Sequence, residues 1–192
     1  ADPAPLTAGI QSEYSLQITD EAGCPIEDLQ TNHERVIHSL FVSADLESFQ
    51  HVHHEDFYEL TVDNIRNATF HFPITFPTSG NYLAIYDFAH RNEWFKATET
   101  LTVTGDIPQL PAYREDYSET VIADDLSVSI EFESSPVAGF ESAFNANISE
   151  ADGTPVGDLI QYLGSDGHLA VVSGDLSYAN HTHAWFPGMG DM

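Results

Sequence analysis

An internal repeat constrains the fold of this chain more than any other feature. Displacing the sequence by 130 residues places 11–54 over 141–184 without a gap, and 13 of the 44 aligned positions are identical. The identities include Gly23 with Gly153, Pro25 with Pro155, His38 with His168, Asp45 with Asp175, His51 with His181 and His53 with His183. A unit of this length is too long for a solenoid repeat and fits a β-sandwich domain with its linker. The sequence therefore predicts two copies of one domain.

Short segments rich in Val, Ile, Phe, Tyr and Thr alternate with turn residues through the first copy. They are 14–19, 36–43, 48–53, 57–62, 68–76, 82–88 and 94–103. Seven short strands with this spacing are typical of an antiparallel β-sandwich of the immunoglobulin or cupredoxin type, and no segment has a convincing helical period. We therefore expect an all-β chain with two tandem sandwich domains.

The repeat also predicts the domain boundaries. The first sandwich is expected over residues 7–105, a linker containing Pro108 and Pro111 over 106–120, and the second sandwich over 121–192. The second copy lacks the C-terminal strands of the first and is expected to be incomplete. Either the sequence is a fragment or a partner supplies the missing strands, and open strand edges would allow an oligomer.

The charge balance excludes several classes of partner. There are 31 acidic residues and 5 basic ones, giving a formal net charge of −26. Nucleic acid is excluded because phosphate binding requires clustered Lys and Arg, and anionic membrane surfaces are disfavoured for the same reason. No apolar run is long enough to span a bilayer. Because hydrophobic residues make up 42% of the chain, the acidic residues are expected to lie outside a packed core.

Three glycosylation sequons indicate the compartment. They begin at Asn67, Asn147 and Asn180, and they favour a secreted eukaryotic protein, either extracellular or at the cell surface. The single cysteine, Cys24, provides no disulfide framework, although an intermolecular bridge is open to it.

The candidate chemistry lies in histidines that recur in the repeat. Each copy has one histidine, an Asp-Leu turn and then a His-x-His pair. Because side chains alternate along a strand and the turn folds the two segments together, the three imidazoles of each copy are expected to converge. The predicted metal ligands are His38, His51 and His53 in the first copy and His168, His181 and His183 in the second. Additional candidates in the first copy are His54, Glu55, Asp56, His71 and His90.

Three imidazoles on a rigid sheet suit Cu(II) or Zn(II) with a position open to another ligand. A blue-copper centre is not expected, because its thiolate ligand has no counterpart: Cys24 precedes Pro25 in a turn, and its repeat partner is Thr154. The alternative interpretation is that the histidines are surface residues or structural partners within turns.

These strings resemble a motif of tandem extracytoplasmic β-sandwich domains that often accompany heavy-metal-handling proteins. The similar segments are 167–176, with Gly-His-Leu and an Asp turn, and 49–53, with Phe-x-His-x-His; 76–82 faintly matches a Phe-Pro-x-x-Gly-x-Tyr strand entry. The chain departs from the motif where Ile37 replaces a Gly and where His54 and Ala184 replace a Pro. The resemblance implies a β-sandwich fold and metal handling, without a particular reaction.

From the sequence we therefore expect a secreted protein that binds a divalent transition metal, copper before zinc. The competing hypothesis is a cell-surface recognition or adhesion module for a protein or glycan, with structural histidines and with Trp94 or Trp185 available to stack on a sugar. A copper-dependent enzyme is the third hypothesis, but no catalytic residue can be identified.

Overall fold

The computed structural model describes residues 5–110 and 118–184. Internal contacts divide the chain into two compact units, one of residues 1–113 with 161–192 and the other of residues 114–160. The second copy of the sequence repeat is therefore shared between the two units. The boundaries inferred from the repeat, at 7–105, 106–120 and 121–192, stay a prediction. Part of that linker, 111–117, and Trp185 lie outside the described residues.

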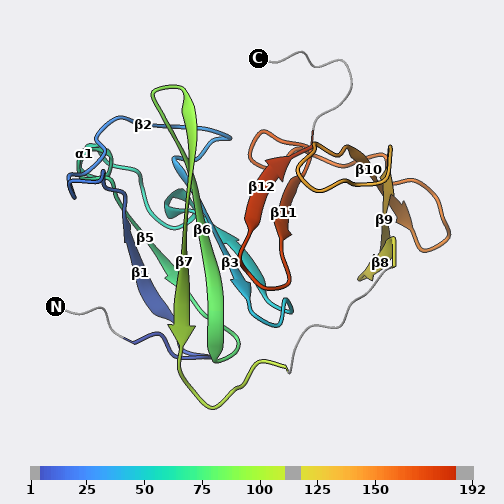
Figure 1. Cartoon of the computed structure of the whole chain (residues 1–192), viewed down its shortest axis with the longest axis horizontal. Helices are drawn as coiled ribbons and strands as arrows, with labels where there is room; N and C mark the ends of the chain where they lie inside the picture. The colour runs from blue at the N-terminus through green and yellow to red at the C-terminus, as the bar shows by residue number, and fades with distance from the viewer. Residues whose placement is uncertain (1–4, 111–117, 185–192) are drawn as a thin grey trace. The chain divides into compact units, whose positions relative to one another are not determined.

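Antiparallel strands build the first unit (Figure 1). A two-stranded sheet pairs β1 (Ser12–Gln17) with β5 (Thr69–Ile74). A larger sheet has the order β2-β6-β3-β4 with β7 alongside β6, and a hairpin pairs β11 with β12. The bounds of these strands are β2 (Leu29–Gln30), β3 (Ile37–Ser43), β4 (Phe49–Val52), β6 (Gly80–His90), β7 (Glu93–Val103), β11 (His168–Val172) and β12 (Ala179–His183). The all-β, antiparallel prediction is confirmed.

The central strand β3 is buried on both faces, and its buried residues include the polar His38, Ser39 and Ser43 beside four apolar ones. One face, with Ile37 and Phe41, packs on the β1–β5 sheet through Leu16, Phe70 and Phe72 in the main core. Two sheets therefore enclose one hydrophobic core in a sandwich-like arrangement.

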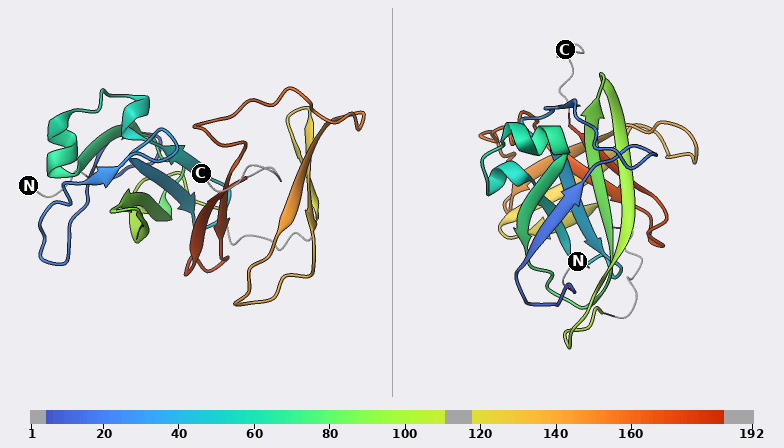
Figure 2. Two further views of the ribbon diagram at one scale, coloured as in Figure 1. Left: turned by 90° about the horizontal axis from the view of Figure 1, so that it is seen from above. Right: turned by 90° about the vertical axis from the view of Figure 1, so that its left-hand side faces the viewer.

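The opposite face of β3 supports the β11–β12 hairpin. Leu40 and Val42 of β3 and Leu83 and Ile85 of β6 form a second apolar cluster with Ala179 of β12. Figure 2 shows the hairpin, in red, beside β3. Residues at even positions of β3, including His38, therefore face the hairpin, because side chains alternate along a strand.

Helical structure is limited to short turns in the described residues. The segment 57–62, predicted as a strand, instead leads from a 3-10 turn, η1 (His54–Asp56), into α1 (Val62–Asn67). A capping box explains α1: Thr61 Oγ1 accepts from Asn64 N, and the Asn64 side chain bonds back to Thr61 N. No described helix is long and apolar enough to cross a bilayer.

The second unit contains a three-stranded antiparallel sheet. Its order is β10-β9-β8, with β8 (Thr120–Ala123), β9 (Leu126–Phe132) and β10 (Phe144–Glu150). β10 corresponds in the sequence repeat to β1 of the first unit. The β8–β9 hairpin precedes the aligned part of the repeat.

The sequence repeat is also a repeat of local structure. The isolated bridge between Thr19 and Pro25 recurs between Ser149 and Pro155. The bridge between Asn32 and Arg35 likewise recurs between Tyr162 and Ser165. Gly23 and Gly153 occupy the same left-handed conformation, with φ of 80° and 86°, which favours glycine. Leu46 and Leu176 also share positive φ values of 61° and 57°. Identical residues in the two copies therefore specify identical turns.

We expect Phe72→Ala to lower the free energy of unfolding by about 3–5 kcal/mol, because Phe72 is 1% exposed and its removal leaves a cavity. The ring stacks on Tyr14 at 5.4 Å between centroids. Urea denaturation would measure the loss. Phe49→Ala is the matched control, because Phe49 is 53% exposed and should cost about 0.5 kcal/mol or less. Equal losses in the two variants would contradict the assigned core.

Candidate metal centre

The first copy brings three imidazoles together, and we call His38, His51 and His53 the first triad. His38 lies on β3, His51 on β4, and His53 directly follows β4. His38 Nδ1 lies 3.2 Å from His51 Nε2 and 3.1 Å from His53 Nε2, and the two Nε2 atoms are 3.0 Å apart. Pairing of β3 with β4, in which Leu40 opposes His51, produces this convergence.

Outer hydrogen bonds determine which nitrogens of the first triad carry protons. His38 Nε2 lies 3.1 Å from the Asn32 carbonyl oxygen, and His53 Nδ1 lies 2.7 Å from Asp56 Oδ2. Both oxygens only accept, so these ring nitrogens donate. When the rings are neutral, His38 Nδ1 and His53 Nε2 therefore point at each other as lone-pair acceptors. Such an arrangement suits a cation between them and is typical of metal-binding histidines with an outer carboxylate or carbonyl.

The second copy builds the same arrangement, and we call His168, His181 and His183 the second triad. His168 Nδ1 lies 3.4 Å from His181 Nε2, while His168 Nε2 donates to the Tyr162 carbonyl at 2.9 Å. Tyr162 is the repeat partner of Asn32, so the outer acceptor is conserved as a backbone position between copies. His183 Nε2 is buried and has no hydrogen-bond partner among the described residues. A buried donor or acceptor without a partner is costly, and a metal ion would satisfy this nitrogen.

Asp87 links the two copies. It lies on β6 directly opposite His38 in the strand register, and its Oδ2 accepts from His181 Nδ1 at 3.0 Å. Its carboxylate therefore leaves Nε2 of His181 free for a metal. Asp56 was predicted as an additional ligand, and the structure places it instead as the hydrogen-bond acceptor of His53. Asp87 was not predicted, because nothing distinguishes it among 31 acidic residues until strand pairing is known.

The two triads are adjacent. His38, His51, His168 and His181 each offer one ligand atom, and these four atoms lie within 4.8 Å of one another. A seventh histidine, His33, stacks on His183 with ring centroids 3.9 Å apart. The residue aligned with His33 in the second copy is Leu163, so the sequence repeat did not mark His33 as a member of the cluster.

Burial disfavours the charged form of His38, His51 and His183. It lowers the pKa of His38 to about 3, although the hydrogen bond to Asn32 opposes the shift. Burial is the main cause that lowers the pKa of His51 to about 2 and that of His183 to about 3, and repulsion from the neighbouring imidazoles adds to it. Metal ligation requires neutral imidazole, so burial holds these three rings in the form that binds a metal.

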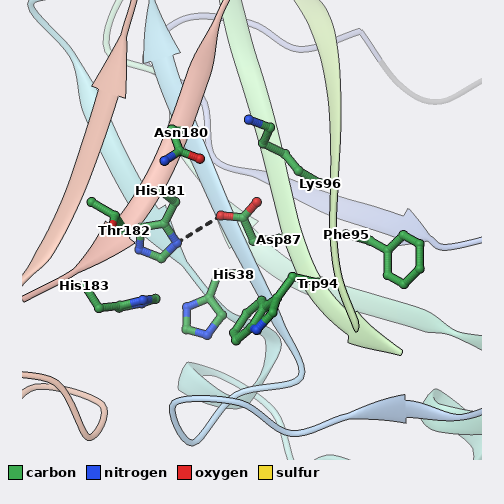
Figure 3. Close-up of a pocket in the computed structure, with 9 residues that line it drawn as sticks. All are labelled: His38, Asp87, Trp94, Phe95, Lys96, Asn180, His181, Thr182 and His183. Carbon is green, nitrogen blue, oxygen red and sulfur yellow. Dashed lines mark hydrogen bonds and ion pairs between the residues drawn. The ribbon is translucent and has the colours of Figure 1, made fainter. Parts of the chain in front are cut away.

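A cavity of about 250 Å³ opens beside the cluster (Figure 3). Figure 3 shows His38, His181 and His183 turned toward one another, with the His181–Asp87 contact dashed. The single lysine, Lys96 of β7, donates to the Ala179 carbonyl, and its Nζ lies 5.0 Å from the Tyr178 ring centroid. These two contacts hold the hairpin against β7. The cavity is lined by His38, Asp87, Trp94, Phe95, Lys96, Asn180, His181, Thr182 and His183. A small exogenous ligand could reach the histidines by this route.

The other candidate histidines lie outside the cluster. His54 Nδ1 accepts from His71 N at 3.0 Å, and His90 Nδ1 lies 2.9 Å from Asp28 Oδ1.

The sequon residues Asn67, Asn147 and Asn180 are all exposed, and Cys24 is exposed and unpaired. The only thiol is therefore not among the residues of the cluster.

A protein-family model described as a domain of unknown function (DUF8832) matches residues 2–105. This span contains the first triad, Asp56 and Asp87, and ends before the second triad. No curated protein and no solved structure matches the chain.

We expect the metal-free protein to lose stability as the pH falls from about 6.5. The pKa of His38 is near 6.5 when unfolded and about 3 when folded. The unfolded chain therefore binds more protons in this interval, and His38 alone contributes a slope of up to about 1.4 kcal/mol per pH unit. Urea denaturation in EDTA between pH 7 and pH 5 would measure it. The His38→Gln variant should have a shallower slope, and equal slopes would contradict the assignment.

Proposed function

The chain belongs to the family of this domain of unknown function (DUF8832), and we propose, from the geometry of its histidine cluster, that it binds a divalent transition-metal ion outside the cell. The observation that carries the proposal is the convergence of His38 Nδ1, His51 Nε2 and His53 Nε2 at 3.0–3.2 Å. Two nitrogens bound to one tetrahedral ion at 2.0–2.1 Å stand about 3.3 Å apart. The three ring nitrogens therefore already have nearly the spacing of a ligand set.

Copper is the proposed metal before zinc. Imidazole nitrogen suits both ions, and a site of given donors binds Cu²⁺ more tightly than Zn²⁺ in the general affinity order. The only cysteine is exposed in the turn at 20–24, which favours a histidine-only centre over a blue-copper site. The resemblance to domains accompanying heavy-metal handling and the three exposed sequons support metal binding in an extracellular setting.

Metal binding should depend on histidines inside the cluster and not on histidines in general. We expect EDTA-treated wild-type protein to bind Cu²⁺ and Zn²⁺ at pH 7.5 in calorimetric titration, and its unfolding free energy to rise by about 2.7 kcal/mol at free metal of 100 times Kd. His51→Gln/His181→Gln removes one ligand from each triad and should lower affinity by more than about 100-fold, since loss of an outer partner alone costs about 10- to 100-fold.

The matched control is His71→Gln/His90→Gln, which removes two histidines outside the cluster. This variant should bind metal as the wild type does. Absence of binding by the wild type, or equal loss in the two double variants, would refute the proposed function.

The outer carboxylate of the first triad should tune affinity. We expect Asp56→Asn to weaken metal binding by about 10- to 100-fold, because the amide replaces the anionic acceptor of His53 Nδ1–H. Asp56 Oδ1 also pairs with Arg35 at 2.8 Å. Arg35→Gln therefore serves as the control, since it removes that ion pair and leaves the His53 contact. Metal affinities that fall equally in both variants would show that the ion pair, and not the acceptor, matters.

A further inference from the structure

The two triads are close geometric copies of one another. In the first triad, the ring centroids lie 5.4, 4.8 and 4.4 Å apart for the pairs 38–51, 38–53 and 51–53, with interplanar angles of 33°, 89° and 62°. The corresponding pairs of the second triad lie 5.5, 4.6 and 4.6 Å apart, with angles of 24°, 86° and 62°. A triad able to hold one ion is therefore present twice.

The rings of different triads are nearly as close as rings within one triad. His51 and His181 lie 5.0 Å apart between centroids, and His181 also lies 5.5 Å from His38. His168 lies 5.5 Å from His51. The apolar cluster beneath them, with Leu40 and Val42 against Ala179, holds the two hairpins face to face at this separation.

The cluster offers more donors than one ion uses. Three inward nitrogens of the first triad lie 3.0–3.2 Å from one another, and two of the second triad lie 3.4 Å apart. The sixth, His183 Nε2, is buried and has no hydrogen-bond partner among the described residues. Zn²⁺ takes four ligands in most protein sites, and catalytic sites use three protein ligands with one open position. Six imidazoles therefore match two ions with three ligands each.

Each triad also has its own carboxylate. Asp56 accepts from His53 in the first triad, and Asp87 accepts from His181 in the second. Two dications at this separation repel each other, and these two negative charges reduce that repulsion. The second ion is still expected to bind more weakly than the first.

We infer that the two triads form one dinuclear centre, in which the two copies of the repeat hold two divalent ions side by side and the cavity beside β7 opens onto the second ion. This inference rests on the proposed metal binding and adds the number of ions and their closeness. Asp87, on β6 of the first copy, is the positioning residue for the second triad.

The test uses the full chain loaded with Cu²⁺, and separately with Zn²⁺, after EDTA treatment. Native mass spectrometry with Zn²⁺ should give two ions per chain. Electron paramagnetic resonance of the Cu²⁺ form should show magnetic coupling between two ions, as broadening or loss of the signal at two equivalents. His183→Gln should reduce the stoichiometry to one and restore the spectrum of an isolated Cu²⁺, and His53→Gln should do the same from the other triad.

The alternatives give different outcomes. A single ion held by His38, His51, His168 and His181 would give one ion per chain, retained in both His183→Gln and His53→Gln, and would overturn the dinuclear centre while leaving the proposed function intact. Two ions without coupling would overturn it as well. No bound ion would refute the proposed function itself. His71→Gln controls for the loss of a histidine, and circular dichroism of every variant establishes that it is folded.

Discussion

The β11–β12 hairpin packs on the outer face of β3 and β6 through a small apolar cluster, and the arrangement of the histidines depends on this contact. Leu40, Val42, Leu83 and Ile85 supply one side, and Ala179 is the buried residue of the other. The same face of β3 carries His38, and the same face of β6 carries Asp87. Apolar packing and the candidate metal centre are therefore parts of one interface.

The histidines are placed where burial disfavours their charge, so the interface carries a cost that hydrogen bonds only partly offset. Outer bonds to Asn32, Tyr162, Asp56 and Asp87 satisfy one nitrogen of four rings. The inner nitrogens of these four rings face other imidazole nitrogens, in pairs whose lone pairs point at each other, and lone pairs that face one another gain nothing without a cation. A bound ion would convert this unfavourable arrangement into a favourable contact between the two copies.

How much of this could be predicted depends on whether each feature is local. The paired glycines Gly23 and Gly153 and the paired Asp-Leu turns adopt matching backbone conformations, because turn geometry is determined by a few adjacent residues. The strand predicted at 57–62 was wrong for an equally local reason, the capping box at Thr61 and Asn64, which the strand-rich composition concealed.

The sequence by itself determined that the chain is all-β and that each copy carries one histidine and a His-x-His pair separated by a turn. Strand alternation and hairpin pairing act over a few residues, so these two triads could be foreseen. Only the tertiary structure decided that the triads are neighbours, that Asp87 of one copy supports His181 of the other, and that His33 stacks on His183. Those contacts join residues about a hundred or more positions apart in the chain, and they follow from side-chain packing between hairpins, which no periodicity in the sequence encodes.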